Sequence, residues 1–392
     1  MPLLPDPSPR DRRFRSVVSV DDHLCEPRDL FVGRRAAAFG EAAPHIVESA
    51  NGTQTWVMEG VSYPNIGLNA VAGRPKEEWN FEPTRFDEMR KGAWDVHARI
   101  ADMDLGGLDV SLCFPSLLAG FAGTKFSQLK DPDLGLACVR DWNDWLAEEW
   151  YGAYPSRFIP MQVSYFADPQ VAAADIAANA GRGFKALSLP EAPHNVGFPS
   201  IHNDYWDPIL RACEESGTVV MLHTGTGGWG NATVSPESPI EQPTTLFPAC
   251  SLLTIADWLW ARVPLRFPKL RIALAEGGIG WIPMLLDRLE FMENHELGAI
   301  GSAWPSADIK PSEAVTAHFW FCTISDPSTI GLHDRINVDH IMLEVDYPHA
   351  STTWPDTHEF VADQFDHLDE TVVEKIVAGN AAVLFDLDLS GV

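Results

Sequence analysis

The chain has 392 residues, of which 45% are hydrophobic and 21% are charged, as in a well-packed globular protein. Asp and Glu number 55 against 28 Lys and Arg, so the formal net charge is −27. A surface this acidic repels nucleic-acid phosphates and anionic lipid headgroups, so neither is an expected partner. An anionic substrate would need a locally positive site, such as a bound metal ion.

The cysteine pattern and the hydropathy indicate a cytoplasmic protein. No two cysteines form a Cys-x-x-Cys pair, which disfavours both a disulfide framework and a zinc ribbon. No uninterrupted apolar run follows the early arginines, as a signal peptide would require, and none reaches the ~18 residues that span a bilayer. The six scattered cysteines are therefore expected to be reduced core thiols: Cys25, Cys113, Cys138, Cys213, Cys250 and Cys322.

The beginning of the chain predicts a surface arm, a first strand and an insertion. Residues 1–15 are rich in Pro and Arg and are expected to form the arm, and residues 16–392 a single domain. The opening strand is predicted at about 16–21. Residues 24–93 contain Gly and Pro clusters and short β-like runs such as 53–58. We expect an inserted excursion with small strands, forming a lid or wall over a site at the end of the first strand.

From residue 95 onward, apolar strand-like runs alternate with segments of helical periodicity. Eight strands are predicted to start near residues 17, 109, 158, 184, 218, 270, 318 and 341. The helices are predicted over 95–105, 135–150, 168–180, 207–216, 251–262, 281–292 and 370–385. This alternation predicts a (β/α)₈ TIM barrel. An open doubly wound sheet is the alternative, but it would usually carry a Gly-rich phosphate loop where this chain has Asp21-Asp22-His23.

The predicted strand ends contain candidate metal ligands. Residues i and i+2 of a strand point to the same side, so Asp21 and His23 can converge. His223 ends the fifth strand and Asp346 follows the eighth, and all strands of a barrel end on the same face. Two imidazoles and two carboxylates suit a divalent ion, Zn²⁺ first and Mn²⁺ second, with a position left for water or substrate. Each residue alone could instead be structural, as a hydrogen-bonded His or a turn-forming Asp.

Several short motifs make the sequence recognisable between residues 17 and 386. It resembles the amidohydrolase superfamily, in particular the amidohydrolase-2 branch of aminocarboxymuconate-semialdehyde decarboxylase-like proteins. The resemblance implies a mononuclear metal held by Asp21, His23, His223 and Asp346, and either hydrolysis or redox-neutral decarboxylation. The motifs are Val20-Asp-Asp-His-Leu-Cys-Glu-Pro27, Met103-Asp104 with Gly107, Phe114-Pro-Ser116, Asn143-Asp-Trp145, Gly183-Phe-Lys185, Tyr205-Trp-Asp-Pro208, Leu222-His-Thr-Gly225, Asp346-Tyr-Pro-His349 and Gly379-Asn-Ala381.

One position departs from that family's pattern. Many relatives have a His after the sixth strand, where this chain has Glu276 before Gly277-Gly278. Glu276 could be a fifth ligand, a general base or a partner that orients a ligand His, or it could have a helix-cap or structural role. With His223 and Asp346, it completes the set of candidate catalytic residues.

Five further residues are candidates for substrate binding. Lys185 at the fourth strand could contact a substrate carboxylate or form a structural ion pair, and His202 follows in the next loop. Trp229 lies just past the fifth strand and could line an apolar pocket for a planar substrate. His318 begins the seventh strand and could face the barrel interior. His349 is expected to orient the acid three residues before it.

Three functions are compatible with these patterns. The first is decarboxylation of an aromatic or unsaturated carboxylic acid, in which Asp346 delivers the proton. The second is hydrolysis of an amide, ester, lactone or C–C bond, with Asp346 or Glu276 as the base. The third is a non-catalytic binding barrel. A small-molecule ligand and a homo-oligomer, dimer or tetramer, are expected, with the final helix and the helix containing Trp142, Trp145 and Trp150 as candidate oligomer surfaces.

Overall fold

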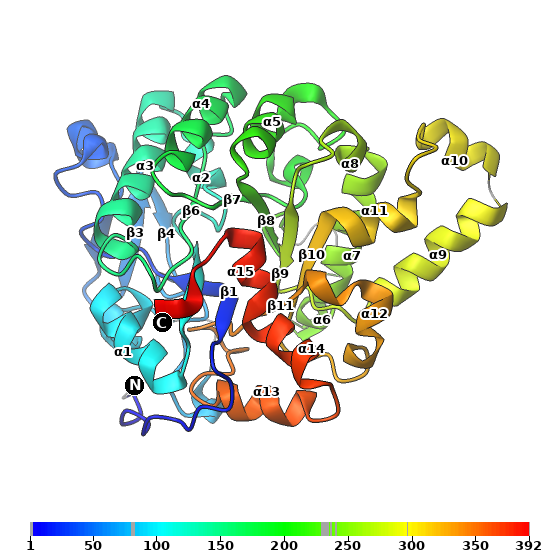
Figure 1. The fold of residues 1–392 in the computed structure, drawn as a ribbon. Helices are drawn as coiled ribbons and strands as arrows, with labels where there is room; N and C mark the ends of the chain where they lie inside the picture. The colour runs from blue at the N-terminus through cyan, green and yellow to red at the C-terminus, as the bar shows by residue number, and fades with distance from the viewer. Residues whose placement is uncertain are drawn as a thin grey trace.

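The computed structural model describes residues 3–79, 83–228, 235, 237–239, 241–295 and 297–391. Eight parallel strands form the centre, and helices pack around them (Figure 1). Nearly every strand residue is buried, as expected where helices cover the outside of a closed sheet. This architecture confirms the predicted (β/α)₈ barrel. The strands are β1 (Val18–Leu24), β5 (Val110–Pro115), β6 (Met161–Gln162), β7 (Ala186–Leu189), β8 (Val219–His223), β9 (Ile272–Ala275), β10 (Phe319–Thr323) and β11 (Ile341–Leu343).

The ring of strands consists of two ladders joined by individual backbone contacts. β1 pairs with β5, and the other six strands pair in the order β11-β10-β9-β8-β7-β6. An isolated parallel bridge between Ser111 and Phe158 links β5 to the segment before β6. On the other side, the Asp346 N–H donates to the Asp21 carbonyl over 2.8 Å and links the end of β11 to β1. The second of these contacts joins two predicted metal ligands through their main chains.

The seven predicted helices are all present, with small shifts at their ends. α1, α3 and α4 each begin after an Asp whose carboxylate accepts hydrogen bonds from the first turn. In α3 this cap is followed by Pro132 at the first helical position, which starts the helix before the predicted residue 135. The first six are α1 (Val96–Gly106), α3 (Pro132–Trp145), α4 (Pro169–Ala180), α5 (Asp207–Ser216), α7 (Phe247–Trp260) and α9 (Ile282–His295). The seventh consists of α14 (Glu370–Glu374), a π-helical segment (Lys375–Gly379) and α15 (Asn380–Phe385).

Shorter helices complete the outer layer. α9 and α10 extend away from the barrel at the right of Figure 1. The additional helices are α2 (Thr124–Ser127), α6 (Glu241–Thr245), α8 (Val263–Arg266), α10 (Leu297–Ala303), α11 (Pro311–His318), α12 (His333–Ile336) and α13 (Thr357–Phe365). None of the helices in the described part of the chain combines the length and apolar character needed to cross a bilayer.

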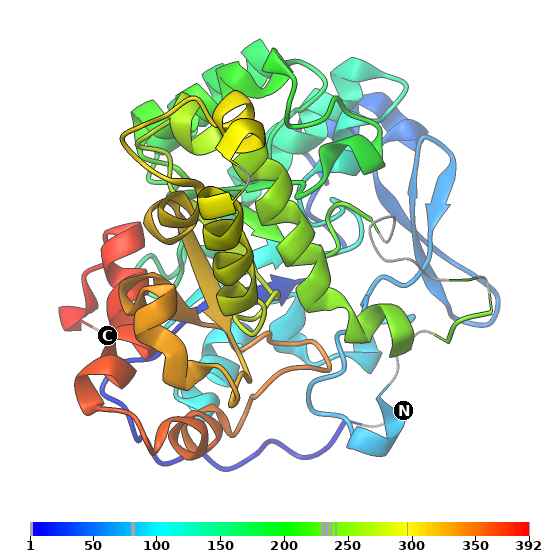
Figure 2. The same ribbon diagram turned by 90° about the vertical axis from the view of Figure 1, so that its right-hand side faces the viewer.

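The excursion between β1 and α1 contains the predicted small strands. β2 (His45–Glu48), β3 (Gln54–Met58) and β4 (Val61–Tyr63) form an antiparallel sheet beside the barrel (Figure 2). Its Trp56 is buried and meets Phe31 edge to face, with ring centroids 6.3 Å apart. This packing anchors the excursion to the protein core. The division into an arm of residues 1–15 and a single domain of residues 16–392 stays a prediction.

The three tryptophans of one candidate oligomer surface are buried. Trp142, Trp145 and Trp150 are all at most 4% exposed, because they pack against one another and against the barrel. The Trp150 ring, for example, lies 5.8 Å from that of Phe158. A side chain buried within its own subunit is not available to a second subunit.

The buried Asn143 of α3 predicts a measurable stability effect. Its side chain donates to the Val163 carbonyl over 2.9 Å and accepts from the Val163 N–H over 3.0 Å, just where the two-residue β6 ends. Asn143→Ala leaves both buried backbone groups unpaired and is expected to lower the free energy of unfolding by about 1–3 kcal/mol in urea titrations. The control is Asn294→Ala, which alters an exposed side chain on α9. Equal stability of the two variants would contradict this role.

Candidate metal centre

The four predicted ligands meet at the carboxyl ends of the strands. His23 Nε2 lies 3.3 Å from Asp346 Oδ1 and 3.5 Å from Asp21 Oδ1. His223 Nε2 lies 3.2 Å from His23 Nε2 and 3.5 Å from Asp21 Oδ1. Four ligand atoms held tetrahedrally around one ion at 2.0–2.1 Å would be about 3.3 Å apart. The spacing therefore matches one coordination sphere for Asp21, His23 and His223, while Asp346 lies in a second group with His23 and His349, so that His23 is shared by the two groups.

The cluster contains polar atoms that need a partner. Within the described part of the chain, both carboxylate oxygens of Asp21 and of Asp346 are buried without a hydrogen bond, as is His23 Nδ1. Leaving charged oxygens unpaired in a protein interior costs several kcal/mol each. A divalent cation would offset both negative charges and accept the imidazole lone pairs. The donor set thus fits such an ion.

Hydrogen bonds from the loop after β8 orient His223. Its Nδ1 donates to the Thr224 carbonyl over 2.6 Å, which leaves the Nε2 lone pair free to face the cluster. The Thr226 hydroxyl donates to the His223 carbonyl over 2.6 Å and accepts from the Glu191 N–H. The Glu191 carboxylate accepts from the Gly225 N–H over 2.8 Å, and burial raises its pKa to about 7. Glu191 thereby helps to shape the loop that holds His223.

Asp22, which lies between the candidate ligands Asp21 and His23 in β1, forms hydrogen bonds that help to hold the cluster in place. The Asp22 carboxylate accepts from the Tyr347 N–H over 2.9 Å and from the Ser111 hydroxyl. Burial raises the pKa of Asp22 to about 7, although the nearby Arg99 charge opposes this. Arg99 donates to the His23 carbonyl and lies 4.5 Å above the Tyr347 ring. These contacts link the backbone of β1 to the segment that carries Asp346.

Aromatic rings lie around His23 and His223, the two candidate ligand histidines. Phe121 stacks on His223 with centroids 4.9 Å apart and meets His23 edge-on at 5.1 Å, and Phe114 lies 4.8 Å from His223. His349 stacks on His23 at 3.7 Å. Burial lowers the pKa of both His23 and His223 well below the usual value. The neutral imidazole that results is the form that binds a metal.

Glu276 belongs to the cluster. Its Oε2 lies 3.5 Å from His223 Nε2, and its backbone N–H donates to the Glu344 carboxylate over 2.9 Å. Burial raises the pKa of Glu276 well above its ordinary range, and the charges of Asp346 and Glu344 add to this. Burial also raises the pKa of Glu344, to about 8. Because α9 starts only at Ile282, the helix-cap interpretation of Glu276 is wrong.

Comparison with known proteins agrees with this geometry. The sequence profile of a family described as amidohydrolase matches residues 61–387. The chain belongs to this amidohydrolase family. The predicted resemblance is therefore confirmed, and with it the expectation that the protein is an enzyme.

Three relatives of this amidohydrolase show how far the likeness extends. A 2-amino-3-carboxymuconate-6-semialdehyde decarboxylase of Dictyostelium discoideum is 23% identical, over 77% of this chain and 80% of the relative. The structure of an amidohydrolase from Mycobacterium avium subsp. paratuberculosis is 21% identical, with a TM-score of 0.76 and coverage of 94% and 99%. That of a 5-carboxyvanillate decarboxylase from Novosphingobium aromaticivorans, complexed with manganese and 4-hydroxy-3-methoxy-5-nitrobenzoic acid, is 17% identical, with a TM-score of 0.65 and coverage of 95% and 96%.

Three residues predicted to bind substrate lie away from the cluster. Lys185 precedes β7 instead of ending it, and its Nζ is 3.6 Å from Asp386 Oδ2. His318 ends α11 and precedes β10. Both are therefore at the amino ends of their strands, opposite the candidate ligands. His202 is 47% exposed and pairs with Asp257 on α7, at 2.7 Å.

One of the two remaining substrate candidates reaches the cluster, and three residues that were not predicted also lie there. His349 does reach the cluster, with its Nδ1 3.1 Å from Asp346 Oδ1, whereas Trp229 lies outside the described residues. Sequence reasoning missed Phe121, Glu191 and Glu344. All three lie after a barrel strand, which is where site residues are expected, but many other loop residues of this amidohydrolase do so as well.

His223→Ala is expected to remove the bound metal while leaving the fold intact, because the other candidate ligands would hold the ion with one imidazole fewer. Elemental analysis of the isolated protein measures the metal, and circular dichroism the fold. The matched control is His318→Ala, at the opposite end of the barrel, which should keep the wild-type metal content. Full metal content in His223→Ala would show that this imidazole is not a ligand.

Proposed function

We propose that this amidohydrolase is a metal-dependent decarboxylase of an aromatic or unsaturated carboxylic acid. The observation that carries the proposal is that Asp21, His23 and His223 lie at metal-ligand spacing and that Asp346 lies 3.3 Å from His23, with the oxygens of both acids unpartnered. The decarboxylases among its relatives support this reaction over the others that the family performs. A small-molecule substrate follows from this class of reaction.

We further propose that these four residues hold one divalent ion. Zn²⁺ suits two imidazoles and two carboxylates. Mn²⁺ is the alternative, supported by the manganese in the Novosphingobium relative. A divalent cation held there supplies Lewis-acid chemistry toward the substrate carboxylate and a neighbouring oxygen. Two carboxylates balance its charge, which leaves the site more receptive to an anion than the acidic surface around it.

The proposed proton donor is Asp346. As the bond between the carboxylate and its carbon breaks, the electron pair stays on that carbon, which takes a proton from Asp346 while CO₂ leaves. Water then reprotonates Asp346. His349, with its Nδ1 3.1 Å from Asp346 Oδ1, positions this carboxyl group. Phe121, which is partly exposed, offers a flat apolar surface to a planar substrate, and the fully buried Phe114 helps it to exclude water from His23 and His223.

Hydrolysis is the second candidate, and Glu276 favours it. Its carboxylate lies 3.5 Å from His223 Nε2, where it could take the proton of an attacking water. A further carboxylate also disfavours an anionic substrate at short range. Homo-oligomerisation and a cytoplasmic location stay predictions, whereas membership of an enzyme family and an intact donor set both argue against the third candidate, a non-catalytic barrel.

CO₂ release distinguishes these functions. The metal-containing enzyme is to be incubated with a panel of hydroxybenzoates and conjugated carboxylic acids, and in parallel with amides, esters and lactones. Decarboxylation predicts CO₂ from at least one acid and no product from the neutral compounds. Turnover of the neutral compounds alone would establish hydrolysis, and no turnover by metal-replete protein would favour the binding barrel.

Asp346→Asn is expected to reduce kcat by at least about 10²-fold, because the amide cannot deliver the proton. Substrate affinity should change less, since the three other candidate ligands stay. Steady-state kinetics and metal content are measured together, so that loss of the ion is recognised. Asp339→Asn, an exposed acid before β11, is the control. Near-normal turnover of Asp346→Asn would exclude the proton-donor role.

A further inference from the structure

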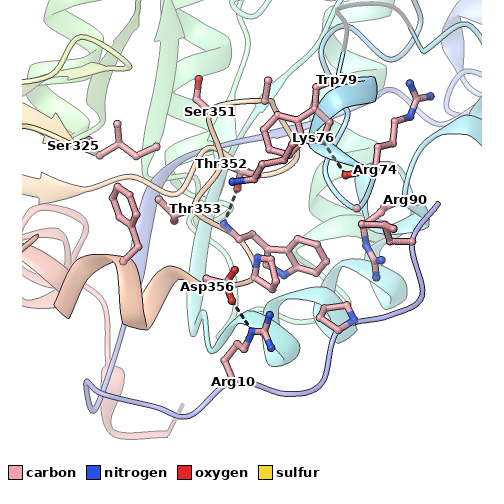
Figure 3. Close-up of a pocket in the computed structure, with 18 of the residues that line it drawn as sticks. Arg10, Arg74, Lys76, Trp79, Arg90, Ser325, Ser351, Thr352, Thr353 and Asp356 are labelled. Carbon is pink, nitrogen blue, oxygen red and sulfur yellow. Dashed lines mark hydrogen bonds and ion pairs between the residues drawn. The ribbon is translucent and has the colours of Figure 1, made fainter. Parts of the chain in front are cut away.

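A second cavity lies beside the loops that follow β10 and β11 (Figure 3). Its volume is about 730 Å³, the size of many small-molecule sites. Its walls come from three distant parts of the chain: residues 4–10, residues 73–90 and residues 350–356, with Ile324, Ser325 and Phe360 completing them. No candidate metal ligand lines it, and neither does Glu276 or His349. It is therefore distinct from the metal centre, although residue 350 directly follows His349.

Two indole rings in this cavity are fixed by hydrogen bonds. Trp79 Nε1 donates to the Arg74 carbonyl over 3.0 Å, and Trp354 Nε1 donates to the Asp102 carbonyl over 2.7 Å. A cation lies above each ring: Lys76 Nζ is 5.6 Å from the Trp79 centroid, and the Arg90 guanidinium 4.7 Å from that of Trp354. Proline rings add further apolar surface. The cavity thus presents flat apolar walls next to positive charge.

The cations of this cavity differ in how they are neutralised. Arg10 pairs with Asp356 at 2.7 Å, and Arg90 pairs with Asp102 and with Asp6. Within residues 3–79 and the other described segments, no carboxylate lies within ion-pair distance of Lys76, which is exposed. Figure 3 shows its side chain pointing across the cavity toward Thr352. Arg74 also lines the cavity, but it is buried and donates to the Glu88 carbonyl, so Lys76 is the exposed cation of this wall that can meet an anion.

We propose that this cavity binds a planar organic carboxylate. The ring of the ligand packs against the half-buried Trp79. Trp354 is only 7% exposed and has the Arg90 guanidinium over its ring, so it forms part of the cavity wall beside the ligand. Its carboxylate meets Lys76, with the hydroxyl groups of Ser351 and Thr352 on the same wall. The proposal does not depend on the decarboxylase reaction, because it needs neither the metal nor turnover.

Calorimetric titration with benzoate tests the proposal on the full-length protein. Wild type is expected to bind with millimolar or tighter affinity, and added salt should weaken binding because a charge is involved. Lys76→Ala should weaken binding about threefold to tenfold, and Lys76→Glu by more than tenfold. Lys76→Arg should retain it. Lys91→Ala is the matched control, since Lys91 also lies over an indole, at 5.8 Å from the Trp94 ring, but pairs with Asp95 outside the cavity.

Two comparisons separate this cavity from the metal centre and define the ligand. Benzoate binding that persists in His223→Ala and is lost in Lys76→Glu belongs to the cavity, and 4-iodobenzoate soaked into crystals should place its iodine between Trp79 and Trp354. Benzyl alcohol, without the charge, and acetate, without the ring, should each bind more weakly than benzoate. Equal binding by Lys76→Glu and wild type, acetate binding as tight as benzoate, or no benzoate binding would overturn the proposal.

Discussion

The burial of unpaired carboxylates at one end of the barrel is the constraint on which this structure depends. Asp21 and Asp346 present all four of their side-chain oxygens to the protein interior without a hydrogen bond in the described part of the chain. Such an arrangement is unfavourable by itself, since each charge loses its hydration. Two neutral imidazoles at ligand spacing do not repay that cost, but a cation would. The cluster therefore makes physical sense as a site for a positive ion.

The surroundings hold this cluster in place through the backbone. Arg99 and Asp22 connect β1, which carries two of the candidate ligands, to Tyr347, which directly follows a third. These contacts hold the two segments together. Glu191 accepts a hydrogen bond from the loop after β8 and thereby holds the segment that follows His223. Because the ligands come from separate strands, small movements between strands would disperse them. These buried bonds oppose such movements and preorganise the site.

Charge is distributed unevenly over the molecule in a way that suits anionic ligands. The formal net charge of −27 repels carboxylates at long range. Locally, a divalent ion at the cluster would offset the charges of Asp21 and Asp346, and Lys76, which has no ion-pair partner among the described residues, places a positive charge in the Trp-lined cavity. Both places also present aromatic rings, Phe114 and Phe121 at the one, Trp79 and Trp354 at the other. An organic acid with a flat unsaturated framework is the ligand that both environments would accept.

The barrel and its four candidate ligands could be predicted from the amino-acid sequence. Eight apolar strands alternating with helices allow few other folds. Because the parallel strands of a barrel all end on one face, Asp21, His23, His223 and Asp346 could be predicted to lie close together. Short-range geometry along a strand was enough for that inference.

The loop residues that lie beside the four candidate ligands could not be predicted from the sequence, because they depend on how distant segments pack. Lys185 and His318 were misplaced because both lie at the start of their apolar runs, and the strands begin only at Ala186 and Phe319; a residue before a barrel strand lies at the amino end, opposite the candidate ligands. Phe121, Glu191 and Glu344 act through contacts between loops and strand ends, which have no periodicity to read. The cavity around Lys76 likewise exists only because three segments distant in sequence pack side by side.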